Sequence, residues 1–271
     1  MSFTLRALSF AALILFSEIL AAEELRIATA SNFTGAMREI TELFEEKTAH
    51  RVLLSTGSSG KFYAQISKGA PFDLFFSADQ KKTEALESDG LVVKDGRFTY
   101  AEGALVAVAG KNSGFTNESL QEAIIDGDIG RIALANPRLA PYGEAAVEAL
   151  GHLNIANSGK NTFVYADNVA QVWQFIHLGL VDVGFVARSQ LGLDILGSAT
   201  AFWAVPKAMY TPIRQDVAWL KQGQDNSAAE AFLRFIRSPD VDAILHNYGY
   251  KKPAGNALSD SFMAKSAALS N

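Results

Sequence analysis

The feature that most constrains this chain is a regular alternation of short β-prone runs with segments of helical apolar spacing. Near the start, the β-prone runs cover residues 25–30, 51–54 and 72–77. The segment after the first run places Phe33 and Met37 on one face, as an amphipathic helix requires. Strands and helices in this order favour a mostly parallel sheet covered by helices on both faces. The chain is therefore predicted to have an α/β fold.

The alternation starts again after Gly103 and predicts a second unit. The expected elements of this unit are strands at 104–109, 131–135, 163–165 and 181–187 and helices at 120–125, 143–153 and 168–178. Further along, the runs 199–205 and 213–220 predict strands, and residues 228–248 predict helix. Two doubly wound α/β lobes are therefore expected in one chain.

No repeat, charge block or low-complexity linker separates the two units. We expect the chain to cross between them near Gly103 and again near residues 210–212. Residues 23–102 plus 212–253 then form the first lobe, and residues 103–211 form the second. Two crossings make a hinge, so a ligand cleft is expected between the lobes.

The first residues are typical of a secretory signal peptide. A positive charge precedes an apolar run at 7–16, which is shorter than the ~20 residues of a membrane span, and the small pair Ala21-Ala22 follows. We expect cleavage to remove residues 1–22, and a buried N-terminal helix is the alternative. The remaining chain is predicted to be exported and soluble. Its end, 254–271, is small and polar and is expected to be a flexible tail.

Composition excludes several classes of function. The chain has 24 Lys and Arg against 29 Asp and Glu, a net charge of −5, and no basic stripe, so no nucleic-acid partner is expected. It has no cysteine, which excludes thiol nucleophiles, Cys-ligated zinc, ordinary iron–sulfur clusters and a lipid-modified cysteine. The 4 histidines stand apart, without the spacing of metal ligands.

The glycine-rich segment 57–61 matches neither of the two catalytic motifs that it approaches. A phosphate-binding P-loop needs a glycine where Ser55 stands and a hydroxyl where Phe62 stands. A nucleophile elbow needs a glycine where Lys61 stands. Because no other motif supplies an activated nucleophile or a paired acid and base, the chain is predicted not to be an enzyme.

Four strand-to-helix turns are rich in neutral hydrogen-bond donors. They are Ser31-Asn32, Gly57-Ser58-Ser59, Pro141-Tyr142-Gly143 and Asp167-Asn168-Val169. Each turn places free backbone N–H groups at a helix N-terminus, and such turns gather at the carboxyl ends of the strands, where the helix dipole favours an anion. The donor turns contain no Lys or Arg and, apart from Asp167, offer no acceptor for a proton. They therefore predict a fully deprotonated tetrahedral dianion as the ligand.

Two alternatives stay open on the residues alone. The turns can be ordinary helix caps, because capping uses the same residue types. Asp167 stands beside one donor turn and can accept the proton that phosphate carries. A receptor for another tetrahedral oxyanion, sulfate or phosphate, is therefore the alternative function.

Several segments together carry a resemblance to a known family. They are residues 30–33, 55–60, 63–66, 69–79, 136–137, 140–143, 168–169 and 184–187. In this order, across residues 25–250, the chain resembles the periplasmic molybdate-binding proteins of bacterial ABC importers, which have the class II periplasmic-binding-protein fold. The resemblance implies capture of molybdate or tungstate in the periplasm and delivery to a membrane permease. It implies no cofactor, with molybdenum met only as the oxyanion, and we expect a monomer.

The same resemblance assigns the ligand-binding residues. They are Ser31, Asn32, Ser58, Ser59, Tyr142 and Val169. Ser59 aligns best with the ligand serine of the family, and Ser58 is the alternative because a shift of one residue exchanges them. Tyr142 and Val169 are expected to donate through backbone N–H groups. Some members place a tyrosine hydroxyl on the ligand where this chain has Ala187, and we hypothesise that the Asn32 side chain replaces that donor.

Overall fold

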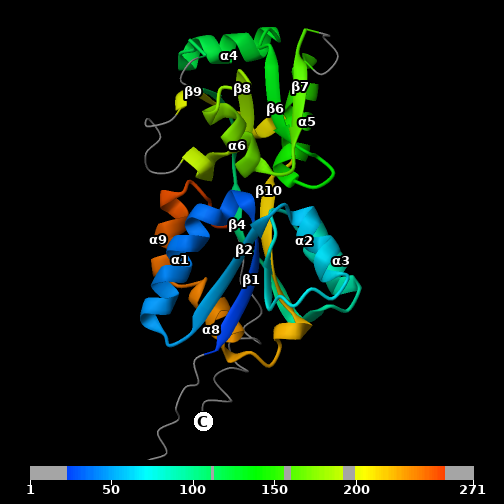
Figure 1. The fold of residues 1–271 in the computed structure, drawn as a ribbon, viewed down its shortest axis with the longest axis vertical. Coiled ribbons are helices and arrows are strands. Elements are labelled where there is room, and N and C mark those ends of the chain that lie inside the picture. The colour runs from blue at the N-terminus through cyan, green and yellow to red at the C-terminus, as the bar shows by residue number, and fades with distance from the viewer. Residues whose placement is uncertain (1–22, 111–112, 156–159, 192–198, 254–271) are drawn as a thin grey trace, which may run out of the picture.

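The computed structural model describes residues 23–110, 113–155, 160–191 and 199–253. The expected signal peptide, 1–22, and the expected tail, 254–271, lie outside the described residues. The described chain forms two lobes, one above the other along the long axis of the molecule, and each lobe is built on its own sheet (Figure 1). The expectation of two α/β lobes in one chain is confirmed.

The sheet of the first lobe has 5 strands in the order β2-β1-β3-β10-β4. The strands are β1 (Glu24–Ala30), β2 (Arg51–Gly57), β3 (Leu74–Phe76), β4 (Val92–Gly103) and β10 (Ile213–Leu220). β1 pairs in parallel with β2 and β3, whereas β10 runs antiparallel to both β3 and β4. The antiparallel strands β4 and β10 are the ones that connect to the second lobe.

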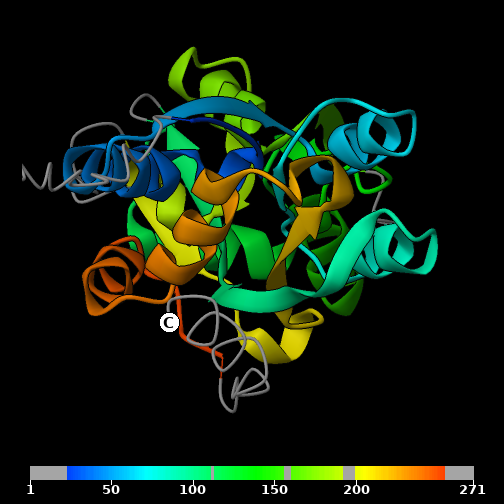
Figure 2. The same ribbon diagram turned by 90° about the horizontal axis from the view of Figure 1, so that it is seen from below.

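Helices cover both faces of this sheet (Figure 2). The helices are α1 (Thr34–Lys47), α2 (Ser59–Ile66), α3 (Lys81–Ser88), α8 (Ser227–Phe235) and α9 (Pro239–Asn247). Side chains of β1 alternate between the two faces of the sheet. Leu25 and Ile27 pack against α1, α8 and α9 on one face. Ala28 packs with Phe62 of α2 and Leu86 of α3 on the other face.

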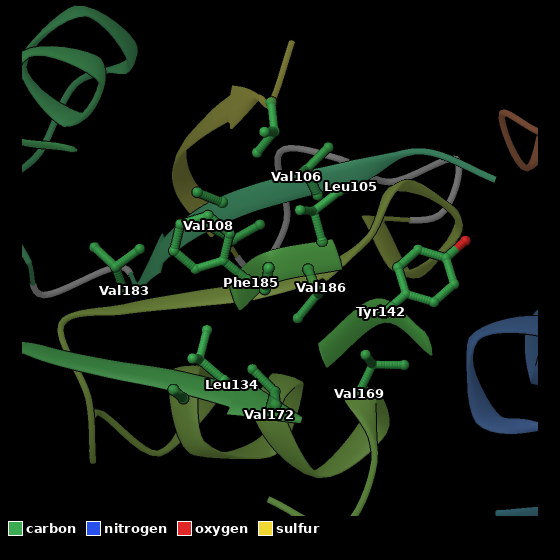
Figure 3. Packing of buried hydrophobic residues seen from close by; sticks show 14 of the residues in the cluster. Leu105, Val106, Val108, Leu134, Tyr142, Val169, Val172, Val183, Phe185 and Val186 are labelled. Carbon is green, nitrogen blue, oxygen red and sulfur yellow. The ribbon is translucent and has the colours of Figure 1, made fainter. Parts of the chain in front are cut away.

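The sheet of the second lobe also has 5 strands, in the order β7-β6-β8-β5-β9. The elements of this lobe are β5 (Leu105–Gly110), α4 (Asn117–Asp126), β6 (Arg131–Ala135), α5 (Pro141–His152), β7 (Thr162–Ala166), α6 (Val169–His177), β8 (Val183–Ala187) and β9 (Ala199–Ala204). β6 pairs in parallel with β7 and β8, and β5 runs antiparallel to β8 and β9. Val108, Leu134, Val172 and Phe185 meet in its core (Figure 3).

The structure departs from the sequence prediction in four places. Each sheet has two parallel and two antiparallel strand pairs instead of being mostly parallel. β4 was not predicted, because its Lys94-Asp95-Gly96 reads as a turn, and Asp95 does have a positive φ of 60° inside the strand. The predicted helix 228–248 is two helices, since Pro239 begins α9 and Ser238 caps it. α5 begins at Pro141, two positions before the predicted start, with the proline in the first turn.

The chain passes between the lobes twice. One passage runs from β4 into β5 through Ala104, and the other runs from β9 to β10 through residues 205–212. The first passage leaves the long strand β4, and the second enters the long strand β10. Because β4 and β10 are paired in one sheet, the two passages lie next to each other where they meet the first lobe. Among the residues that the structure describes, no helix is long and apolar enough to span a bilayer.

Candidate oxyanion-binding site

A small cavity lies between the two lobes and is lined by every predicted ligand residue. Its lining residues are Ala30, Ser31, Asn32, Gly57, Ser58, Ser59, Ala78, Ala140, Pro141, Tyr142 and Val169. In this closed arrangement it has room for about one water-sized sphere, far less than pockets for organic ligands offer. The lining set contains no Lys, Arg, Asp, Glu or His. The cavity therefore suits a small ligand that is held by neutral groups.

Each of the predicted donor turns follows the carboxyl end of a strand. The 3-10 helix η1 (Ser31–Phe33) follows β1 directly, and α2 follows β2 after Ser58. In the second lobe, α5 follows β6 and α6 follows β7. The first N–H groups of these helices have no partner inside the helix, and the helix dipoles add positive potential at the same ends. The arrangement brings four helix N-termini to one cavity.

The serine pair presents two different hydroxyl groups to the cavity. Within the described residues, the buried Ser58 Oγ has no hydrogen-bond partner, and Ser58 occupies the N-cap position of α2 without a capping bond from its side chain. Ser59 Oγ accepts a hydrogen bond of 2.9 Å from the Ala78 N–H, so its own hydrogen is left to donate. A buried hydroxyl without a partner is unfavourable, which points to a ligand that Ser58 contacts.

The second lobe contributes backbone groups at the start of α5 and α6. Tyr142 follows Pro141 in the first turn of α5, where the backbone N–H has no partner within the helix. Val169 is the first residue of α6, and the Asn168 side chain caps the N–H of Gln171 and leaves that of Val169. Both side chains are buried in the hydrophobic cluster of the second lobe, and the Tyr142 ring lies at its edge with the hydroxyl directed away from it (Figure 3).

The Asn32 side chain does not replace the missing tyrosine donor, so that prediction is wrong. Its amide donates to Gln215 Oε1 at 2.8 Å and to the Tyr250 hydroxyl at 3.0 Å, which uses both hydrogens. The backbone carbonyl of Asn32 accepts a hydrogen bond from the Ser189 hydroxyl at 2.7 Å. The side chain thus anchors the first donor turn, and the backbone N–H of Asn32 is the group left for a ligand.

The Ala187 side chain has no donor, and in the described structure the backbone N–H of Ala187 is already bonded. The Ala187 N–H donates to Gln190 Oε1 at 3.1 Å, and Gln190 Nε2 donates to the Val169 carbonyl at 3.1 Å. Gln190 therefore tethers the start of α6 to the end of β8.

Asp167, which kept phosphate open as a ligand, is not among the residues that line the cavity. Its carboxylate pairs with Lys61 across the two lobes at 2.6 Å, and both side chains are about half exposed, at 58% and 47%.

Gly60 N–H also donates to the Leu139 carbonyl across the cleft at 2.8 Å. Lys81 pairs with Glu144 at 2.7 Å in the same way. These contacts hold the lobes in a closed arrangement, and the exposed ion pairs contribute only ~0–1 kcal/mol each.

A buried polar network behind the cavity was missed by sequence reasoning. Its members beyond the predicted site are Tyr100, Ser189, Gln215 and Tyr250. Burial raises the pKa of Tyr100, Tyr142 and Tyr250 above the ordinary tyrosine value, so all three stay protonated. The signal in the sequence was the polar run Arg214-Gln215-Asp216, which lies between Ile213 and the apolar residues 217–220 of one strand.

The site predicts an anion affinity that does not depend on pH near neutrality. Tyr142 is the one ionisable side chain in the cavity lining, and its pKa is raised well above the ordinary value by burial. A raised pKa keeps the hydroxyl protonated as pH rises, so the site does not change charge. The dissociation constant of a permanently charged oxyanion should change less than about twofold between about pH 6 and 9. Calorimetric titration at several pH values checks this, and a steep loss across that range would reveal a titrating ligand group.

Comparison with known proteins identifies the class. The sequence profile of the bacterial extracellular solute-binding proteins matches residues 25–251. The chain belongs to this family, whose members bind solutes for transport and are not enzymes.

In the described part of the chain, no group of three or more His, Cys, Asp or Glu side chains is placed to hold a metal ion.

Within this class the chain is a homologue of the ModA proteins. The molybdate-binding protein ModA of Azotobacter vinelandii is 40% identical over 230 residues, which cover 84% of this chain and 90% of the relative. ModA of Rhodobacter capsulatus is 38% identical over 230 residues, covering 85% and 89%. The solved structure of the periplasmic molybdate-binding protein of Azotobacter vinelandii superposes with a TM-score of 0.77 at 34% identity, covering 84% of this chain and 99% of that chain.

Proposed function

We propose that this protein is a periplasmic receptor that captures molybdate, and also tungstate, and delivers the anion to the membrane permease of an ABC importer. Its ligand-binding residues are Ser31, Asn32, Ser58, Ser59, Tyr142 and Val169. Residues 1–22 act as the export signal, and the mature protein works as a monomer. The lobes comprise residues 23–102 with 212–253 and residues 103–211, and they close around the anion.

One observation carries this proposal. The buried Ser58 hydroxyl has no partner among the described residues, and it lines a cavity whose other polar groups are donors from both lobes. A ligand that satisfies all of these donors must be rich in acceptors and small. A tetrahedral oxyanion meets both conditions, and the molybdate-binding function of the two ModA relatives agrees with it.

The number of donors is sufficient for tight binding. Hydrogen bonds to a charged group contribute roughly 1.5–3 kcal/mol each, so about six or seven supply on the order of 10–20 kcal/mol before the costs of association and ordering. Submicromolar binding requires about −8 kcal/mol. Because the donors come from two lobes, the anion favours the closed form, which a permease can recognise.

Selection among tetrahedral anions follows from protonation and size. Phosphate retains a proton near neutrality, and the lining set offers no carboxylate to accept it. Sulfate is smaller than molybdate and leaves part of the donor set unsatisfied, which costs affinity. Molybdate and tungstate are nearly equal in size, so the cavity does not separate them. Sulfate and phosphate are thus disfavoured for different reasons.

Thermal unfolding of the purified mature protein tests the proposal. A ligand that binds only the folded state stabilises it by RT ln(1 + [L]/Kd), which is about 2.7 kcal/mol at about 100 times Kd. For a chain of this size the midpoint should rise by about 5–10 °C with molybdate or tungstate. No comparable rise is expected with equal sulfate or phosphate. A rise with sulfate or phosphate alone would keep the receptor and overturn its ligand.

A further inference from the structure

Gln215 lies in β10 next to the cavity without lining it, and it contacts two of the proposed ligand residues. The side chain is fully buried. Its Oε1 accepts hydrogen bonds from Asn32 Nδ2 at 2.8 Å and from the Tyr100 hydroxyl at 3.0 Å. Its Nε2 donates to the Tyr142 hydroxyl at 3.2 Å. Asn32 belongs to the first lobe and Tyr142 to the second, so one amide joins donor turns on opposite sides of the cleft.

The strand that carries Gln215 is built to hold this side chain in place. The register of β10 against β4 shifts between Gln215 and Asp216, whose partners are Ala101 and Thr99, so Tyr100 is the extra residue of a bulge. Bulges re-aim side chains, and here the Tyr100 hydroxyl reaches the Gln215 amide. The next residue, Asp216, is held by Arg97 and Thr99, each at 2.6 Å.

The hinge backbone leaves space for the contact between the lobes. Gly103 ends β4, immediately before the first passage to the second lobe. A Cβ at this position would lie 2.0 Å from the Tyr142 hydroxyl oxygen and 2.6 Å from Gln215 Nε2. Any residue other than glycine would therefore displace the pair. The Tyr142 hydroxyl also points out of the core of its own lobe (Figure 3).

We propose that Gln215 is a positioning residue that senses closure of the cleft through the Tyr142 hydroxyl. In the closed form, the hydroxyl satisfies Nε2 while Oε1 orients the Asn32 turn. When the lobes separate, Tyr142 moves away with α5 and this bond is lost, whereas the bonds of Gln215 to Tyr100 and Asn32 stay within one lobe. The bond then stabilises only the closed form and so contributes to anion affinity. This inference rests on the proposed function.

Tyr142→Phe removes the hydroxyl and keeps the backbone N–H that is proposed to hold the anion. It leaves Gln215 Nε2 buried without a partner in the closed form alone. We expect the molybdate dissociation constant to rise about tenfold, mainly through faster release, with little change in the unfolding midpoint measured without anion. Gly103→Ala, which displaces the same pair, should weaken binding in the same direction.

The matched control is Tyr210→Phe. The Tyr210 hydroxyl is also buried and also accepts an N–H, that of Leu105 at 3.2 Å, but this bond does not involve the anion cavity. The control should lower stability and leave the dissociation constant within about twofold of the wild-type value. A merely structural role for Tyr142 would give the same result as this control.

A double-mutant cycle completes the test. Adding Tyr142→Phe to Gln215→Met should cause no further loss of anion affinity, because Gln215→Met has already removed the bond between Gln215 Nε2 and the Tyr142 hydroxyl. In unfolding measured without anion, the effects of the two substitutions on the free energy of unfolding should simply add. Wild-type affinity in Tyr142→Phe, or additive losses in the double variant, would overturn the inference. A wild-type protein that binds no tetrahedral oxyanion would instead overturn the proposed function, and this inference with it.

Discussion

Gly143→Ala is expected to weaken molybdate binding by about 10–150-fold, because the loss of one hydrogen bond to a charged ligand costs roughly 1.5–3 kcal/mol. A Cβ at Gly143 would lie 2.1 Å from the Ala135 carbonyl oxygen at the end of β6. That neighbour is strand backbone and cannot turn aside, so the first turn of α5 has to move. The displacement carries the adjacent Tyr142 N–H away from the cavity.

The control for this variant lies in the same helix. Gly151 is also in α5, and a Cβ there would meet nothing within 4 Å. Gly151→Ala should retain wild-type affinity and raise stability by roughly 0.5–1 kcal/mol, as glycine-to-alanine changes in helices do. Calorimetric titration of both variants, with circular dichroism to verify folding, gives the comparison. Wild-type affinity in folded Gly143→Ala would show that the start of α5 does not hold the anion.

Replacing both serines, Ser58→Ala with Ser59→Ala, is expected to weaken molybdate binding by about 10²–10⁴-fold. Each hydroxyl is proposed to donate to the anion, and a hydrogen bond to a charged group is worth roughly 1.5–3 kcal/mol, or about 10–150-fold in the dissociation constant. Ser88→Ala serves as the control, because its exposed hydroxyl bonds only to the Glu84 carbonyl of its own helix.

The single serine variants should differ in stability without anion. Ser58 Oγ has no partner in the described structure, so Ser58→Ala should leave the free energy of unfolding nearly unchanged. Ser59→Ala removes the acceptor of the buried Ala78 N–H and should lower that free energy by about 1–3 kcal/mol. Urea unfolding measures both values. Equal stability losses would contradict the different roles assigned to the two hydroxyls.

The sequence was most informative where local chemistry determines structure. The apolar spacing of the first helical segment predicted α1, and each predicted donor turn lies where a strand ends and a helix begins. Such turns can be recognised because both their capping residues and their neighbouring apolar runs are local. The ligand residues that the family resemblance assigned lie in these turns, and all of them line one cavity.

Features that depend on distant residues were not predictable in the same way. Asn32 and Gln215 are separated by 183 positions, and nothing near Asn32 indicates that its amide has partners in the first lobe. Its side chain was therefore assigned to the ligand, as a replacement for the tyrosine donor that the family resemblance places at Ala187. β4 was missed for a local reason, since Asp95 takes a left-handed conformation within the strand and its flanking residues are typical of a turn.

The central claim is that neutral donors from both lobes hold molybdate in the cavity between them. Calorimetric titration of molybdate into the mature protein, with and without about a hundredfold excess of sulfate over protein, tests it most directly. We predict one anion per chain, a dissociation constant below about 1 µM, and no more than a small change with sulfate present. Absence of molybdate binding, or displacement of molybdate by sulfate at similar concentrations, would contradict the account.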